Sequence, residues 1–442
     1  MRNGAEWEET TLGTEVDLLT GFPFKSERYT DLPESIPLVR GDNIVQGAMR
    51  WNGVKKWPLS ERGEYELYEL REGDVVLAMD RPWIEAGLKY AAISKHDLPC
   101  LLVQRTARLR GGPKLDTGYL RYLIGSLEFT QHIHAITTGT AVPHISGRQI
   151  KDFAFALPPI AEQKAIAAVL GALDDKIELN RRMNATLEAM ARALFQSWFV
   201  DFDPVRAKLD ARPPAGLDQA TAALFPASFQ DSPAGHIPHG WTAKPLPEAV
   251  EVNPRRTLKG GTIAPYLDMK NLPTQGHSAD KVVDREFSSG TKFQNGDTLL
   301  ARITPCLENG KTGYVDFLHD GQVGWGSTEY IVLAPKPPFP PQFGYLLARS
   351  DALRTHAIQN MTGTSGRQRV PSECFSNFQL AVPTPAIARR FDELTEPQMA
   401  QIKANSTESR TLATLRNTLL PKLLSGEVSV RTGTNPVSAG NR

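Results

Sequence analysis

Short apolar runs alternate with turn-forming residues over two stretches of the chain, and this pattern predicts β-strands. The runs are Val75–Met79, Leu101–Val103, Thr298–Ala301 and Tyr330–Leu333. Gly, Pro, Asp and Asn separate them, as is typical of strands joined by turns. One helical stretch follows in each half, over Gly118–His134 and Phe343–Gln359. We therefore expect two globular units of the α+β class.

A longer pattern with helical spacing follows the first of these units. From Ala161 to Phe199 the chain contains no proline. Apolar or amide side chains recur every three or four residues at Leu170, Leu173, Ile177, Asn180, Asn184, Leu187, Ala191, Leu194 and Trp198. This spacing predicts a coiled-coil helix. A second helix is predicted from Pro385 to about Leu420. We expect Pro397 to kink or restart it, and Pro421 and then Ser425-Gly426 to stop it.

The two halves of the chain repeat the same order of features. Gly73–Ala78 matches Gly296–Ala301, Thr138-Gly139-Thr140 matches Thr362-Gly363-Thr364, and Leu157-Pro158 matches Val382-Pro383. Two copies of one fold would keep such an order. The sequence therefore predicts an α+β protein with two globular domains in a tandem pseudo-repeat, separated by two long antiparallel coiled-coil helices.

The same features place the domain boundaries. We expect a first globular domain over 1–157, a long helix over 158–200 and a largely extended, Pro-rich linker over 201–234. A second globular domain would occupy 235–383, a second long helix 384–426 and a flexible tail 427–442.

The composition limits how this chain could bind nucleic acid or associate with a membrane. The 442 residues carry 50 Lys plus Arg against 49 Asp plus Glu, and neither globular half is strongly basic. Any binding of nucleic acid must therefore come from local patches and not from a bulk positive field. The three cysteines form no C-x-x-C pair, and no apolar segment is long enough to span a bilayer. We expect a cytoplasmic protein that does not associate with membranes.

Motifs of self-sufficient catalysis are incomplete. Asn309–Thr312 resembles the end of a phosphate-binding loop, but Pro305 stands where that loop needs a glycine. Lys336–Phe339 resembles the Pro-Pro-aromatic motif of amino-methyltransferases, yet lysine replaces the residue that would hold the target amine. The histidines lack metal-ligand spacing, and no nucleophile elbow or Gly-rich dinucleotide loop is present. We expect no catalytic residue, metal or cofactor in this chain.

Longer motifs carry a resemblance to a known family. They are Ala156–Gln163, Leu173–Ile177, Ser197–Val205, Gly235–Trp241, Ala301–Lys311 and Leu419–Gly426. In this order they resemble the specificity (S) subunits of type I restriction-modification enzymes, over nearly the whole chain. One departure concerns Glu162-Gln163, which has no counterpart at the start of the second helix. Arg389-Arg390 or Ile387-Ala388 stand there, so this helix is expected to dock its partner differently.

The resemblance implies a non-catalytic subunit whose two target-recognition domains each read one half of a bipartite, asymmetric sequence in double-stranded DNA. It implies that the long helices set the spacer and bind two modification (methyltransferase) subunits, which hold S-adenosylmethionine and methylate adenine. Restriction/translocase subunits would use ATP and Mg for translocation and cleavage. Two other interpretations remain open: a specificity subunit of another phage-defence methylation system, and a coiled-coil DNA-binding scaffold that acts without a methyltransferase.

Candidate DNA contacts lie in the loops after each Gly-Asp strand and in the Thr-Gly-Thr loops. In the first domain they are Arg81, Trp83, Lys89, His144 and Arg148. In the second they are Arg302, Asn309, Lys311, Arg367, Gln368 and Arg369. Arg and Lys suit guanine edges or phosphates, and Asn or Gln suits adenine. We expect replacement of Arg367 and Arg369, which share one loop, to weaken DNA binding without affecting assembly.

Asn180 and Asn405 occupy matching seam positions of the two helices. Buried amides at such positions can fix the register of a helix pair. The other interpretation places them at the edge of the seam, in water, and the sequence leaves both open.

Overall fold

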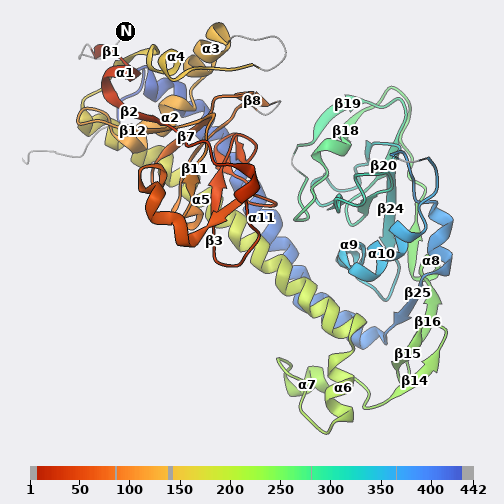
Figure 1. The fold of residues 1–442 in the computed structure, drawn as a ribbon. Helices are drawn as coiled ribbons and strands as arrows, with labels where there is room; N and C mark the ends of the chain where they lie inside the picture. Colours follow the sequence, from red (N-terminus) through yellow and green to blue (C-terminus); the bar gives the residue numbers. More distant parts are fainter. Residues whose placement is uncertain (1–6, 85–86, 138–142, 280, 365, 431–442) are drawn as a thin grey trace, which may run out of the picture. The chain divides into compact units, whose positions relative to one another are not determined.

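The computed structural model describes residues 7–84, 87–137, 143–279, 281–364 and 366–430 (Figure 1). The chain forms two compact units, residues 1–176 with 411–442 and residues 177–410. Each unit therefore contains one globular domain and a part of both long helices. Within the described ranges, no helix combines the length and apolar character that a membrane crossing needs. The predicted Thr138-Gly139-Thr140 loop and the tail from residue 431 lie outside the described residues.

The globular part of the first unit is built on a four-stranded antiparallel sheet of order β10-β7-β12-β2. Its central strand β7 is entirely apolar and entirely buried, because the strand is covered on both faces. The strands are β1 (Glu8–Thr11), β2 (Val16–Thr20), β3 (Ser35–Val39), β4 (Ile44–Val45), β5 (Ala48–Met49), β6 (Lys56–Pro58), β7 (Val75–Ala78), β8 (Trp83–Ile84), β9 (Gly87–Leu88), β10 (Tyr90–Ala92), β11 (Leu101–Leu102), β12 (Thr106–Gly111) and β13 (Ala154–Leu157). The helices are α1 (Leu12–Glu15), α2 (Thr117–Ile124), α3 (Leu127–Ile136) and α4 (Gly147–Lys151).

The second unit repeats this arrangement around the sheet β17-β24-β21-β22. Its strands are β14 (Phe229–Ser232), β15 (Gly235–Pro238), β16 (Thr242–Pro245), β17 (Val250–Val252), β18 (Ile263–Leu267), β19 (Val283–Glu286), β20 (Thr291–Phe293), β21 (Thr298–Ala301), β22 (Thr312–Tyr314), β23 (Gly324–Gly326), β24 (Tyr330–Pro335) and β25 (Gln379–Val382). Its short helices are α6 (Asp203–Leu209), α7 (Gln219–Ala223), α8 (Leu246–Ala249), α9 (Pro341–Arg349) and α10 (Asp351–Gln359).

The predicted duplication is confirmed element by element. β7 and β21 begin at the matching Gly-Asp motifs, and β12 and β24 pair with them in the same antiparallel sense. β1 pairs with β13 just as β16 pairs with β25. Two globular domains thus form a tandem pseudo-repeat, as the sequence predicted.

Both long helices are present and run antiparallel. α5 (Ile160–Phe195) ends in a π-helical turn, Gln196–Val200, and α11 (Pro385–Leu424) is the longer of the two. The helix does not restart at Pro397, and it continues past Pro421 to end at Leu424, just before Ser425-Gly426, so the expected stop at Pro421 was wrong. Proline costs a helix one hydrogen bond, and burial of Phe391 and Met399 on either side of Pro397 offsets that loss.

The single helical stretch predicted in each domain is in fact two helices. In the first unit Ser126 begins α3, and its hydroxyl accepts a hydrogen bond from the Phe129 amide at 3.0 Å. In the second unit Ser350 begins α10 and accepts from the Leu353 amide at 3.3 Å. A serine cap stabilises a new helix start, so each stretch divides at the matching serine.

The expectation of a largely extended linker after residue 200 was also wrong. This segment forms α6, α7, β14 and β15, and it joins the main core of the second unit. Phe225 packs edge-on against Trp198 at 4.9 Å between ring centroids, and Phe202 packs against Trp241 at 5.7 Å. The buried aromatic residues between the prolines supply enough apolar surface to fold the segment.

Candidate nucleic-acid interface

In the first unit, three chain segments meet at the end of strand β7. The Met79 amide donates to the Arg105 carbonyl at 2.9 Å, and the Met79 carbonyl accepts from the Ile145 amide at 2.9 Å. The Arg81 amide donates to the Pro143 carbonyl at 2.7 Å. We call this meeting point the first junction. It is defined by residues 79–81, 105 and 143–145.

The second unit forms an equivalent junction at the end of strand β21, defined by residues 302–304, 329 and 368–370. The Arg302 amide donates to the Glu329 carbonyl at 3.0 Å, and the Arg302 carbonyl accepts from the Val370 amide at 2.8 Å. The Thr304 amide donates to the Gln368 carbonyl at 3.0 Å. Each of these bonds has its counterpart in the first junction. The two junctions are therefore the same backbone structure.

Asp80 organises the side chains of the first junction. One carboxylate oxygen accepts from Arg105 Nη1 at 2.9 Å, and the other lies 2.5 Å from His144 Nδ1. Arg81 is exposed and adopts a left-handed backbone, with φ of 45°. The structure thus brings Arg81 and His144, two of the candidate DNA contacts, into one junction; their contact with DNA stays a prediction. It adds Arg105, which the sequence analysis missed because no motif marks the turn before β12.

Glu329 has the corresponding role in the second junction. Its carboxylate accepts from both Nε and Nη2 of Arg369, at 2.9 and 2.7 Å, and this bonding raises the pKa of Arg369. Arg367 is exposed in the same loop. Arg302 is half-buried, and its Nε has no hydrogen-bond partner among the described residues. The backbone of Arg302, Gln368 and Arg369 therefore lies in one junction, and their contact with DNA stays a prediction.

The other candidates of the first domain lie outside the junction bonds. The Trp83 ring packs on His134 with centroids 4.3 Å apart, and Arg148 is exposed on α4. Lys89 is only 8% exposed. Burial lowers its pKa; the nearby Asp42 opposes this shift, whereas Arg50 and Arg81 add to it.

Lys311 and Asn309 differ from the remaining candidates of the second domain. Lys311 Nζ donates to the backbone carbonyls of Met269 and Lys270 at 2.6 and 3.0 Å, so it holds a neighbouring turn. Asn309 is exposed in the connection between β21 and β22. Gly310 follows with φ of 76°, and its amide donates to the Leu307 carbonyl at 2.8 Å, as in a turn.

A buried arginine stabilises the loops beside the second junction. Arg349 is 6% exposed and donates to the carbonyls of Thr274, Gly310, Gly276 and Thr312 at 2.6 to 2.8 Å. No sequence motif marks this role, because only the folded chain brings these carbonyls together around one side chain.

The two seam asparagines are buried between the helices. Asn180 is 0% and Asn405 4% exposed. Asn180 Nδ2 donates to Glu408 at 2.7 Å and lies 3.3 Å from the Asn405 carbonyl, while Asn405 Nδ2 donates to Asn184 at 2.8 Å. This burial favours the reading in which amides join the two helices inside the seam. A role in fixing register stays a prediction.

The start of α11 lacks the Glu-Gln pair found at the start of α5, and contacts within the chain account for this difference. Gln163 is fully buried and bonds the Asp116 amide and the Lys114 carbonyl, each at 2.8 Å. Arg390 instead binds Asp218 and Thr221, at 3.0 and 2.8 Å, and so holds the folded segment that contains α7. Both side chains therefore anchor their own unit, and Gln163 is not available to dock a partner.

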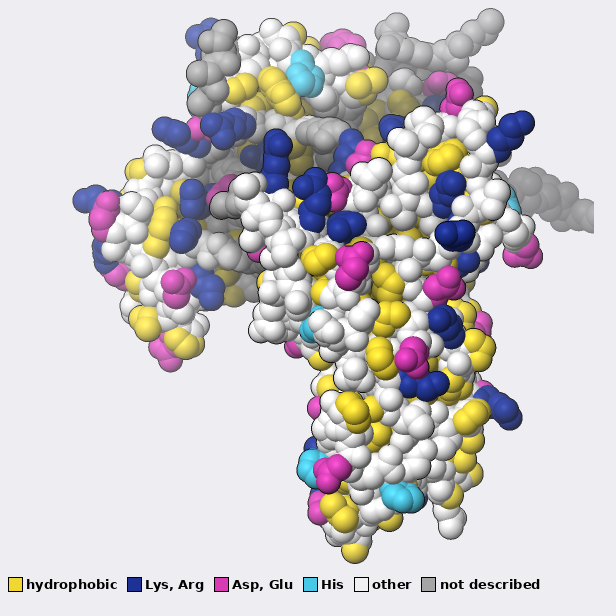
Figure 2. All heavy atoms as spheres, turned by 90° about the vertical axis from the view of Figure 1, so that its right-hand side faces the viewer, with side chains coloured by type: hydrophobic (Ala, Val, Ile, Leu, Met, Phe, Trp, Pro, Cys, Tyr) yellow, Lys and Arg dark blue, Asp and Glu magenta, His cyan; other side chains and the backbone are white. Residues whose placement is uncertain are grey.

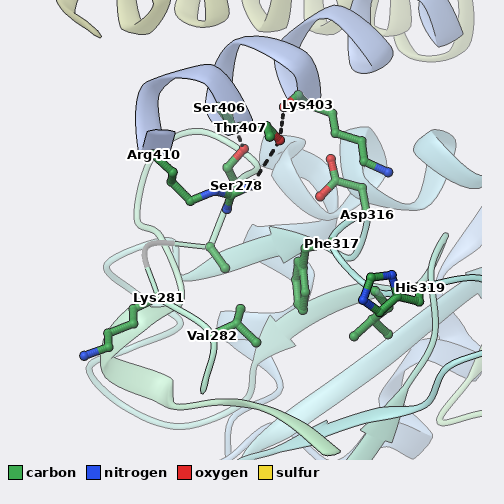
Figure 3. A pocket seen from close by; sticks show the side chains of 12 residues that line it. Ser278, Lys281, Val282, Asp316, Phe317, His319, Lys403, Ser406, Thr407 and Arg410 are labelled. Carbon is green, nitrogen blue, oxygen red and sulfur yellow. Dashed lines mark hydrogen bonds between the residues drawn. The ribbon is translucent and has the colours of Figure 1, made fainter. Parts of the chain in front are cut away.

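Figure 2 shows Lys and Arg side chains on the surface among acidic, hydrophobic and uncharged ones. A pocket of about 520 Å³ lies where α11 meets the second domain (Figure 3). Lys403 and Arg410 line it, and Ser278 bonds Ser406 across it at 3.0 Å. Among the described residues, no group of three His, Cys, Asp or Glu side chains could hold a metal ion.

Comparisons with known proteins agree on one family. Residues 5–189 match the type I restriction modification DNA specificity domain. The type I restriction enzyme EcoAI specificity subunit of Escherichia coli is 38% identical over 170 residues, which are 38% of this chain and 28% of that protein. The HindI specificity subunit of Haemophilus influenzae is 24% identical over 359 residues, covering 70% of this chain and 77% of the relative.

A relative that covers more of the chain is the MjaIX specificity subunit of Methanocaldococcus jannaschii, 25% identical over 409 residues, or 90% of this chain and 84% of the relative. The crystal structure of the type I restriction-modification S subunit from M. genitalium has the same fold. Its TM-score is 0.54 at 15% identity, over 96% of this chain and 97% of that one.

Proposed function

We propose, from the premise that this chain belongs to the family of type I restriction-modification specificity subunits, that it recognises a bipartite target in double-stranded DNA. Each globular domain reads one half of the target. The chain itself carries out no chemistry and directs adenine methylation, or cleavage, by partner subunits in the cytoplasm.

The observation that supports this proposal is the pair of equivalent junctions. Both present cationic side chains on the same backbone, yet the side chains differ between the two. Phosphate contacts position a protein on DNA, and base contacts give sequence preference. Two similar surfaces with different side chains suit a target whose halves differ in sequence.

A stripe of exposed apolar residues on α5 supports docking of partners on the helices. Leu179, Met183 and Met190 are 44%, 37% and 53% exposed, and their spacing places them on one helix face. Exposed apolar surface of this kind marks a site of protein interaction. We propose that two modification subunits, which supply S-adenosylmethionine, dock on the helices, and that restriction subunits supply ATP- and Mg-dependent cleavage.

Methylation-sensitive sequencing tests this function. The chain is expressed with its methyltransferase partner in cells that lack other adenine methylation, and the partner alone is the control. We expect adenine methylation at one bipartite motif only when both chains are present. Methylation that is the same without this chain, or that follows no bipartite motif, would contradict the proposal.

A further inference from the structure

We propose that Arg105 reads a guanine in the half-target bound by the first domain, and that Asp80 and His144 are the residues that position it. This inference rests on the proposed function and extends it to one side chain. Four observations about the first junction carry it.

The backbone at this place is strained. Arg105 has φ of 64° and Arg81 has φ of 45°, both in the left-handed region that favours glycine. Arginine rarely adopts this conformation, and strain of this kind concentrates at functional sites. The turn before β12 thus keeps an arginine where glycine would be accommodated more easily.

The hydrogen-bonding groups of Arg105 remain available. Its side chain is 69% exposed, and Nη1 makes its one described hydrogen bond, to Asp80. Arg369 in the second junction differs, because both Nε and Nη2 are already bound to Glu329. A guanidinium needs two free N–H donors for the bidentate contact with guanine O6 and N7. Arg105 meets this requirement.

The neighbouring carboxylate favours a base over a phosphate. Asp80 partly neutralises Arg105 and would repel a phosphate placed beside the pair, whereas the guanine edge is an uncharged acceptor. Direct readout also requires a side chain held in one orientation. Asp80 provides this, because Arg105 binds one of its oxygens and His144 the other.

The test uses the full chain assembled with its methyltransferase, and duplexes that carry the motif found by sequencing. Arg105→Ala should weaken binding of the cognate duplex about 10- to 100-fold and relax the preference at one guanine of the first half-target. Binding to unrelated duplex should stay the same. Arg105→Lys keeps the charge but loses the paired donors, so it should relax the same position.

Asp80→Asn should give a smaller loss at that same position, since it loosens Arg105 without removing it. Arg62→Ala is the matched control, an exposed arginine of the first unit that is paired with Glu69 away from the junction; it should leave both affinity and motif unchanged.

Three results would overturn the inference: no change for Arg105→Ala, equal weakening on all sequences with a shallower salt dependence, or a change confined to the other half-target. The first result would leave Arg105 outside the interface, and the second would make it a phosphate contact. If the wild-type complex methylates no bipartite motif, the proposed function itself fails, which is a different outcome. Thermal melting of each variant checks that the fold is kept.

Discussion

The two junctions share their backbone hydrogen bonds but take their carboxylate from different segments. The turn before β12 carries Arg105 in the first unit, and the turn before β24 carries Glu329 in the second. The loop that closes the junction carries His144 in the first and Arg369 in the second. In the first junction the carboxylate that binds an arginine is Asp80, from the segment after β7, whereas in the second it is Glu329, from the turn before β24. Ile303 stands where the first junction has Asp80.

This difference shows that main-chain hydrogen bonds hold each junction together, whereas the side chains on it can differ. Main-chain bonds hold the segments together whatever their side chains, so substitutions at the surface cost the domain little stability. A duplicated domain can then acquire a new sequence preference while its fold is kept. The following experiments test this comparison, from the largest expected effect to the smallest.

The second junction depends on a buried arginine that the first lacks. Gly125 takes the matching place at the end of α2, where an added Cβ would lie 2.2 Å from the Tyr90 hydroxyl. Arg349→Met should destabilise the second unit by about 3 kcal/mol or more, since several buried carbonyls lose their donor. Urea unfolding measures the loss, and hydrogen exchange should show it around residues 273–276 and 310–312.

Arg354→Met is the control, because this half-buried arginine makes a single longer described bond, to the Glu308 carbonyl at 3.2 Å. It should cost less than about 1 kcal/mol. Equal losses for the two variants would contradict the special role of Arg349.

The loop of the second junction should contribute to the affinity for DNA. Arg367→Ala combined with Arg369→Ala should weaken DNA binding about tenfold or more and make its salt dependence shallower by one or two phosphate contacts. Copurification with the methyltransferase should be unchanged, since neither residue lies on the helices. Normal methylation of the cognate site by the double variant would contradict this prediction.

The helix seam in the second unit is joined by amides, whereas in the first unit Asp174 accepts from Arg416 at 2.6 Å. Asn405→Ala should destabilise the second unit by about 1 kcal/mol, because the partner oxygen of Asn184 loses its donor. The exposed Lys403→Ala, on the same helix, should have little effect. Denaturant midpoints of the two variants provide the measurement; equal midpoints would argue against the amide contact.

Replacement of Lys89 should have the smallest effect on stability, and it should stabilise the first unit where the other variants destabilise theirs. Burial lowers its pKa, so the folded state binds this proton less tightly than the unfolded state does. The wild-type chain therefore gains stability as the pH rises from the lowered pKa toward 10.5. Lys89→Met should stabilise the first unit by less than about 1 kcal/mol at pH 7. That gain in stability should shrink as the pH rises toward 10.5, and thermal melting at several pH values measures it. A gain that grows with pH would contradict the prediction.

Much of the fold was predictable because it depends on local pattern. Seam residues such as Leu170 and Trp198 are buried in the helix pair, and the Gly-Asp motifs begin matching strands. The errors have a common cause. Pro397 and the prolines after residue 200 predict interruption, yet packing of Met399 and Phe225 outweighs their local cost.

The sequence by itself determined the duplication, the two helices, the resemblance to one family and the loops that carry candidate contacts, because these depend on repeated motifs and on the spacing of apolar residues along the chain. Tertiary structure alone decided which of those candidates meet. It placed Arg105 beside Asp80, although 25 residues separate them in the sequence, and it turned Lys311 and Gln163 inward to hold their own unit. The physical reason is that strand pairing brings distant segments together, and the hydrogen bonds that form there fix each side chain's direction.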